Sequence, residues 1–414
     1  MENDSLKDSS ENNSNKNSTE SNSNNVKLVA FYLPQFHVIP ENDEWWGKGF
    51  TEWVSVKNAK PLFNGHKQPK EPQELGYYDL TDKSVMENQI KLAIEHGING
   101  FCFYHYWFNG KLLLEKPVEE FLKNKDLKIN FCLAWANDSW RKNWYNSSEE
   151  LLLKQEYGTR EDWIKHFNYL LPFLKDERAI KVDGKPIILI HKTGGFIKEN
   201  LSPKDNKLAE SRFVPEPILN EMIKCWREEA LKNSLKGIYI VGALIQVAIV
   251  DTSIERKKEI LNKFDFDAVY SLAPFNLTFD VDKSTLAIPP EVNPNLDSTE
   301  LLKNFGPLMV NYDEAWKKCI QYPKLFPVQF NGAFVSWDNT PRHLKQGMVL
   351  NGSTPEKYGF YLKQLIQQIS KDPKDKRIIF INSWNEWSEG AYLEPDKENG
   401  KRYLEATKKA LEES

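Results

Sequence analysis

The sequence lacks the features that indicate a membrane protein, a secreted protein or a nucleic-acid-binding protein. It has no run of about 18 apolar residues, so no transmembrane segment is predicted. Residues 1–25 are rich in Asn, Ser, Lys and Glu and have no apolar signal core, which predicts a cytoplasmic location and a disordered polar tail. The 55 Lys and Arg residues nearly balance the 59 Asp and Glu residues, so nucleic acid is not an expected partner.

Metal and cofactor motifs are also missing. The four cysteines lie far apart and none forms a CxxC pair, so we interpret them as buried apolar thiols: Cys102, Cys132, Cys225 and Cys319. Three histidines follow strand candidates singly, without HxH or HExxH spacing: His37, His105 and His191. No GxGxxG or GxxxxGK[ST] sequence occurs. The sequence therefore predicts neither a metal site nor a cofactor.

What the chain does contain is a repeated unit of a short apolar strand followed by a helix-like segment, from residue 26 onward. Eight strand candidates occur, at 27–34, 98–108, 128–136, 186–191, 237–245, 267–273, 327–335 and 377–383. Helical spacing is found at 82–96, 161–174, 217–231, 355–370 and 401–412. Eight such units without a phosphate-binding glycine motif favour a single α/β domain over residues 26–414, folded as a (β/α)8 TIM barrel.

Two connections in this barrel are too long to be simple turns. They cover residues 35–79 after the first strand and 274–312 after the sixth. Long connections in compact domains are usually functional, and in this fold they lie on the face that carries catalysis. We expect both to form walls of the site.

Aromatic and polar side chains follow nearly every strand candidate, where barrel enzymes place their functional residues. Indole faces pack on sugar rings, and carboxylates and amides bind sugar hydroxyls, so we predict an oligosaccharide or polysaccharide as substrate. Core packing is the alternative for each single tryptophan, but three of them share the first long connection. The predicted substrate-binding residues are Tyr32, His37, Trp45, Trp46, Glu52, Trp53, His105, Tyr106, Trp135, Asn137, Asp138, Trp337, Asp338, Trp384 and Asn385.

The strongest local signal is NSWNEWSEG at residues 382–390, where Glu386 and Glu389 follow the last strand. Glycosidic bond cleavage needs one carboxyl group that stays protonated and a second that stays ionised. We predict these two glutamates as the catalytic pair, and neighbouring tryptophans are expected to raise the pKa of the less solvated one. The alternative is a solvated loop. Three other carboxylates are expected to bind hydroxyls or to be structural: Glu52, Asp138 and Asp338.

Several blocks of the sequence resemble the WbsX-type proteins of polysaccharide gene clusters, which are similar to glycoside hydrolase family 99, the endo-α-mannosidases and endo-α-mannanases. The blocks are FYLPQFH (31–37), NDEWWGKGFTEW (42–53), HYWFNGK (105–111), WANDSW (135–140), GAFVSWDNTP (332–341) and WNEWSEGAYLEPD (384–396). The resemblance implies a (β/α)8 barrel and net retention at an α-mannoside. In that scheme, Glu386 deprotonates the sugar 2-hydroxyl, which attacks its own anomeric carbon, and Glu389 protonates the leaving oxygen.

Three functional hypotheses follow. The first is a retaining glycoside hydrolase acting on an α-linked, mannoside-like glycan in surface polysaccharide metabolism. The second is a glycosyltransferase or transglycosylase of O-antigen or capsule assembly, because WbsX-type proteins carry that label. The third is a non-catalytic glycan-binding barrel. One departure bears on the substrate, since Trp387-Ser388 stands where characterised family 99 hydrolases tend to carry Trp-His.

Overall fold

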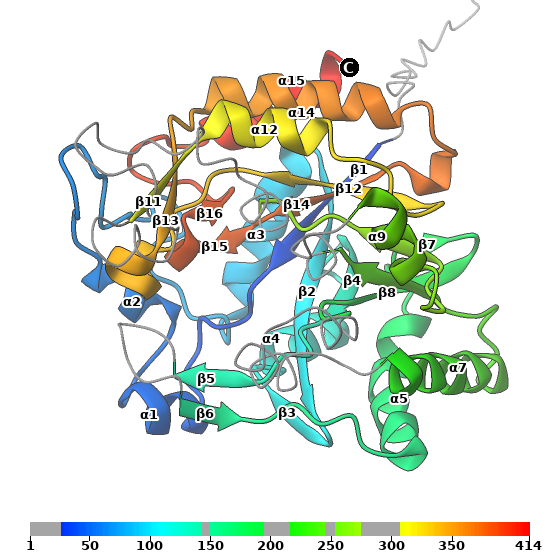
Figure 1. Ribbon diagram of the computed structural model, residues 1–414. Helices are drawn as coiled ribbons and strands as arrows, with labels where there is room; N and C mark the ends of the chain where they lie inside the picture. The colour runs from blue at the N-terminus through cyan, green and yellow to red at the C-terminus, as the bar shows by residue number, and fades with distance from the viewer. Residues whose placement is uncertain (1–25, 143–149, 194–215, 245–252, 275–306) are drawn as a thin grey trace, which may run out of the picture.

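A closed barrel of eight parallel strands forms the centre of the computed structural model, which describes residues 26–142, 150–193, 216–244, 253–274 and 307–414 (Figure 1). In chain order the barrel strands are β1 (Lys27–Tyr32), β2 (Ile98–Phe108), β4 (Asn130–Trp135), β8 (Lys185–Ile190), β9 (Tyr239–Ala243), β10 (Ala268–Tyr270), β12 (Gln329–Phe334) and β14 (Ile378–Asn382). Because β1 pairs with both β14 and β2, the sheet has no open edge. The predicted TIM barrel is confirmed, while the predicted tail, residues 1–25, lies outside the described residues.

The barrel strands divide their side chains between two apolar cores, because successive side chains of a strand point to opposite faces. In β1, Val29 and Phe31 belong to the core inside the barrel. Leu28, Ala30 and Tyr32 belong to the larger core between the barrel and its helices. Since both faces are buried, the strands are nearly continuous apolar runs, which is why they could be found in the sequence.

Helices cover the outside of the barrel, and a helix lies between each pair of consecutive barrel strands (Figure 1). They are α3 (Lys83–Glu95), α4 (Lys116–Lys123), α5 (Arg160–Lys175), α7 (Glu216–Lys232), α9 (Ile254–Leu261), α12 (Tyr312–Ile320) and α14 (Pro355–Ile369), with α15 (Arg402–Glu412) after the last strand. Side-chain caps fix where several begin: Asp82 accepts from the amide of Ser84 at α3, and Thr159 and Asp162 form a capping box at α5. None of these helices, nor any other in the described ranges, has the length and apolar character needed to span a bilayer.

The connection after β1 contains two short helices, α1 (Pro40–Trp46) and α2 (Glu52–Asn58). The second long connection, predicted over residues 274–312, lies outside the described residues from 275 to 306; it resumes at β11 (Leu308–Asn311), which pairs with β13 (Met348–Asn351). Shorter elements are β3 (Lys111–Leu113), β5 (Trp140–Lys142), β6 (Glu150–Leu153), β7 (Lys181–Val182), β15 (Asn385–Glu386), β16 (Ala391–Tyr392), α13 (Thr340–His343) and the 3-10 turns η3 (Leu344–Gln346), η4 (Lys374–Lys376) and η5 (Trp387–Glu389).

Candidate active site

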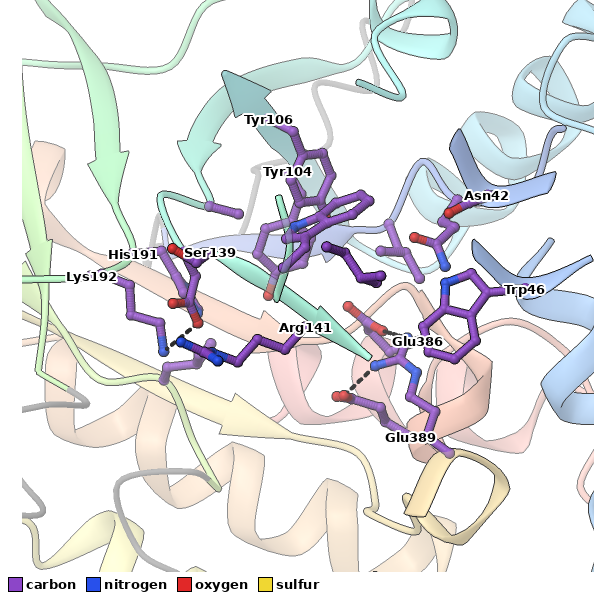
Figure 2. Close-up of a pocket in the computed structure, with 18 residues that line it drawn as sticks. Asn42, Trp46, Tyr104, Tyr106, Ser139, Arg141, His191, Lys192, Glu386 and Glu389 are labelled. Carbon is purple, nitrogen blue, oxygen red and sulfur yellow. Dashed lines mark hydrogen bonds and ion pairs between the residues drawn. The ribbon is translucent and has the colours of Figure 1, made fainter. Parts of the chain in front are cut away.

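A cavity of about 440 Å³ lies at the carboxyl ends of the barrel strands (Figure 2). Its size falls in the range of about 300–1,000 Å³ that is typical of small-ligand sites. Five of the residues predicted from the sequence line it: Trp46, Tyr106, Asp138, Glu386 and Glu389. The two glutamates therefore face a common pocket at the mouth of the barrel.

One guanidinium group joins the two glutamates to a third carboxylate. Arg342, on α13, donates from Nη2 to Glu386 Oε2 at 3.3 Å and from Nη1 to Glu389 Oε1. The same side chain donates from Nε to Glu52 Oε1 at 3.1 Å, and Nη2 also bonds this oxygen. Glu52 is fully buried on α2, behind the pocket. Four side chains from three segments thus form one ionic cluster with a formal excess of carboxylates.

Burial sets the protonation behaviour of this cluster. It raises the pKa of Glu386 well above its usual value, and the neighbouring charge of Glu389 raises it further. Burial also raises the pKa of Glu389, while the charge of Arg342 opposes that rise. Because three carboxylates share one cation, the pair retains a proton more readily than exposed glutamates do. A buried pair of this kind provides both a proton donor and a proton acceptor near neutral pH.

Asp338 holds the turn that carries Glu389. Its backbone amide donates to the carbonyl oxygen of Glu389 at 2.6 Å. Its carboxylate accepts from His66 Nε2 at 2.8 Å, from Gln68 Nε2 at 2.7 Å and from the Thr340 hydroxyl at 2.6 Å. Burial opposes ionisation of Asp338, but these bonds outweigh it and lower its pKa. The predicted binding residue Asp338 thus stabilises the turn that contains Glu389. It lines a separate polar cavity of about 500 Å³.

Gly390 ends that turn in the left-handed region, with φ +60°, and a Cβ built there would lie 2.9 Å from the backbone nitrogen of Asp338. We therefore expect Gly390→Ala to lower the free energy of unfolding by about 1–3 kcal/mol and to reduce turnover by displacing Glu389. Urea unfolding and kcat measure the two effects. The matched control is Gly352→Ala, at φ +90° with Lys357 Nζ at 3.7 Å. If both variants lose turnover equally, the contact with Asp338 is not the cause.

A second buried carboxyl group supports the turn from the outer side of the barrel. Glu394 accepts from Trp387 Nε1 at 2.6 Å, from Gln89 Nε2 at 2.6 Å and from the Tyr78 hydroxyl at 2.9 Å. Burial raises the pKa of Glu394 to about 7, although these hydrogen bonds act in the opposite direction. The predicted binding residue Tyr32 joins this network, because its hydroxyl donates to Gln89 Oε1 at 2.7 Å. Tyr32 thus supports the site from behind.

Three other predicted binding residues, two on strands and one just after β14, belong to the outer core or contact the helices and do not line the pocket. His105 contacts His166 of α5, with 2.8 Å between their Nε2 atoms, and burial lowers its pKa to about 3. Trp135 donates to the carbonyl oxygen of Trp107 at 3.2 Å, and Trp384 packs on Phe101 with ring centroids 5.1 Å apart. Tyr104 and Tyr106, on either side of His105, line the pocket. The two-residue period of β2 therefore separates binding candidates from core residues.

The remaining predicted residues lie around the pocket without lining it. His37 bonds the carbonyl oxygen of Pro34 at 3.0 Å, and Asn385 exchanges two hydrogen bonds with the backbone of Leu33.

Trp53 packs on Trp387 with ring centroids 5.4 Å apart, and Trp45 packs on Trp140 with ring centroids 5.7 Å apart. Asn137 bonds the backbone of Lys192 on both sides, and Trp337 lines the second cavity. None of these predicted residues lines the pocket of Glu386 and Glu389, so a direct contact with substrate stays a prediction for them.

Several lining residues were not predicted from the sequence: Gln35, Asn42, Tyr104, Arg141, His191, Lys192 and Arg342. Two signals were available for some of them. Strand alternation places Tyr104 on the same face as Tyr106, and Gln35 directly follows the first strand candidate. Within the described ranges, no group of three His, Cys, Asp or Glu side chains is arranged to hold a metal ion.

Comparison with known proteins gives a family match over nearly the whole described fold. The family described as Glycosyltransferase WbsX matches residues 28–407. An uncharacterized protein WxcX from Xanthomonas campestris pv. campestris is 33% identical over 385 residues, which are 93% of this chain and 49% of that protein. The chain therefore spans about half the length of this curated relative.

Comparison with solved structures gives matches at low sequence identity. A glycoside hydrolase-like protein superposes with a TM-score of 0.53 at 14% identity, covering 93% of this chain and 94% of the other. A GH99 endo-alpha-mannosidase from Bacteroides thetaiotaomicron gives a TM-score of 0.47 at 15% identity, covering 93% and 96%. The first of these likenesses supports the fold alone.

Proposed function

The chain belongs to the Glycosyltransferase WbsX family, a family of carbohydrate-active enzymes, and from this premise we propose that its pocket cleaves or transfers an α-linked, mannoside-like glycan with retention of configuration. The observation that carries the proposal is the placement of Glu386 and Glu389 in one cavity, both bound to Arg342. Aromatic side chains of Trp46, Tyr104 and Tyr106 line the same cavity. A sugar ring packs favourably on such faces.

In the proposed reaction the sugar 2-hydroxyl is the nucleophile. Burial and the charge of Glu389 raise the pKa of Glu386 more than that of Glu389 in the free protein, so the reaction requires the shared proton to lie on Glu389 once the substrate is bound. Glu386 takes its proton, the oxygen forms a bond to the anomeric carbon, and the glycosidic bond breaks as Glu389 gives its proton to the leaving oxygen. Glu389 then takes a proton from an incoming hydroxyl group, which attacks the anomeric carbon. The bond between that carbon and the 2-oxygen breaks, and Glu386 returns its proton to the 2-oxygen. Two inversions at the anomeric carbon give net retention.

Hydrolysis and transfer differ in this scheme only by the acceptor. Water as the incoming group gives a hydrolase, and a sugar hydroxyl gives a transglycosylase. The family description names a glycosyltransferase and so favours transfer, which is our second candidate function. We propose that this transfer serves the assembly of a surface polysaccharide. The cytoplasmic location remains a prediction from the sequence.

Incubation with defined α-mannosides and related glycans, followed by mass spectrometry, tests the proposal. Each glycan is supplied with water alone, with an acceptor sugar, and with an activated nucleotide-sugar donor. We expect shortened products with water and lengthened products with the acceptor, both requiring Glu386. Binding without any product across the panel contradicts the proposal and supports a glycan-binding barrel. Products formed only from a nucleotide sugar, which then also stabilises the protein thermally, support a conventional transferase.

A further inference from the structure

The active-site cavity has two ends of different charge. One end contains Glu386 and Glu389 with Arg342. At the other end Figure 2 shows Arg141 and Lys192, and both side chains line the same cavity. Asp138 also lines this end, with its carboxylate 3.2 Å from Lys192 Nζ. The described charged side chains at this end are therefore two cations and one carboxylate, an excess of one positive charge.

The side chain of Asn137 holds the backbone of Lys192 in place. The side chain of Asn137 accepts from the Lys192 amide at 2.7 Å and donates to the Lys192 carbonyl oxygen at 3.0 Å. Asn137 is fully buried, so this clamp is shielded from solvent. Lys192 itself is one-fifth exposed, which leaves its ammonium group accessible from the cavity. A rigid backbone with an accessible charged tip is typical of a ligand-binding side chain.

Arg141 is placed by the β5–β6 hairpin, in which it pairs with Leu151. The preceding residue, Trp140, packs edge-on against Tyr106 and Phe108 with centroids 5.2 and 5.8 Å apart, which fixes the hairpin to β2. A guanidinium has five N–H donors in a fixed plane. It can therefore bind two oxygens of a carboxylate or phosphate and still keep another partner.

Neutral aromatic side chains also line the cavity. Figure 2 shows His191 beside Lys192 at the cationic end, with Nδ1 3.2 Å from the Tyr270 hydroxyl, and burial lowers its pKa to about 3, so it is neutral at physiological pH. Tyr104 packs edge-on against His191 with centroids 6.0 Å apart. Both residues line the cavity. Tyr104 lies between His191 and Glu386 in Figure 2, so a neutral aromatic side chain separates the acidic end, where the bond is broken, from the cationic end.

We infer that Arg141 and Lys192 bind an anionic group, a carboxylate or a phosphate, carried by the substrate next to the sugar held at Glu386 and Glu389. The inference rests on the proposed function in taking a glycan as the ligand, and it specifies an acidic or phosphorylated glycan. An anion is unfavourable beside the glutamates, so the same charge pattern also fixes the direction in which the substrate lies in the cavity.

Calorimetric titration of the full chain carrying Glu386→Gln, which prevents turnover, tests this inference. The probes are α-mannobiose, the same disaccharide with one sugar oxidised to a uronic acid, and the same disaccharide carrying a 6-phosphate. We expect at least one charged disaccharide to bind about tenfold more tightly than the neutral one, as for a charge-assisted hydrogen bond. The charged probe that binds more tightly identifies the source of the anion.

Added variants assign the preference to residues. Arg141→Gln and Lys192→Gln are each expected to remove most of the preference, measured as the ratio of the affinity for the charged disaccharide to the affinity for the neutral one. The matched control is Lys154→Gln, which removes an exposed lysine paired with Glu156 beyond β6. It should retain the full preference.

Three outcomes overturn the inference: equal affinity for all three probes, no binding of any probe, or a preference that persists when both cations are replaced. Its failure is distinguishable from failure of the proposed function. If the native chain cleaves neutral α-mannosides and shows no preference for charged ones, the inference falls and the proposed function stands. If charged probes bind through Arg141 and Lys192 but the native chain turns over no glycan, the proposed function falls.

Discussion

Glu386→Gln is expected to lower kcat by about 10²- to 10⁴-fold, the usual contribution of a general base or acid. The amide keeps the shape of the side chain but cannot take the proton of the sugar 2-hydroxyl. Substrate affinity should change much less, because the aromatic wall and the rest of the pocket are retained. Steady-state kinetics on whichever glycan the native chain accepts measures kcat and KM separately.

The fold of this variant should be as stable as the native one, or slightly more stable. Glu386 is buried beside Glu389 and Glu52, and removing one of three carboxylates relieves like-charge repulsion. Thermal unfolding checks this point. The matched control is Glu405→Gln, an exposed position on α15, which should change neither kcat nor stability. Native turnover in Glu386→Gln, on every accepted substrate, contradicts the catalytic assignment.

The barrel was predictable because its strands are buried on both faces. In β14, for example, Ile378 and Phe380 pack inside the barrel while Ile379 and Ile381 pack under the helices, so the first four residues of the strand are apolar. Such runs are visible without knowledge of neighbouring segments.

The sequence predicts which residues follow each strand. To predict which of these residues face the pocket, the alternation of side chains along the strand is also needed. Cys102 inside the barrel fixes the phase of β2, and from it Tyr104 and Tyr106 point inward while His105 points to α5. The sequence prediction selected residues by chemical type and so included His105 with Tyr106 and omitted Tyr104. Applying the two-residue period to each strand end corrects this selection.

Arg342 could not be predicted from local sequence. Its partner Glu52 is 290 residues away, and the two meet only because α2 and α13 lie over the same end of the barrel. Glu386 and Glu389 lie 44 and 47 residues from Arg342. A contact of this separation depends on the closed barrel as a whole, so a single sequence gives no spacing that indicates it.

Arg342→Met should therefore destabilise the chain strongly, by about 3–5 kcal/mol at pH 7, because it leaves buried carboxylates without their cation. The methionine fills a similar volume, so the loss reflects charge rather than a cavity. Urea unfolding measures the effect. Arg160→Met is the matched control, since Arg160 forms an exposed pair with Glu228, and it should change stability little.

The pH dependence separates this electrostatic cost from a general packing defect. Burial raises the folded-state pKa of Glu386 and Glu389 above the ordinary value of 4.5, so their contribution to stability is fully present below pH 4.5 and is lost as pH rises through the folded pKa. Removing Arg342 removes the charge that opposes this rise in pKa, so the variant loses more stability than the native chain over the same increase in pH. The gap in unfolding free energy between variant and native chain should widen from pH 5 to pH 8. A gap that is constant over this range indicates lost packing and contradicts the role of Arg342 as the cation that keeps Glu386 and Glu389 partly ionised.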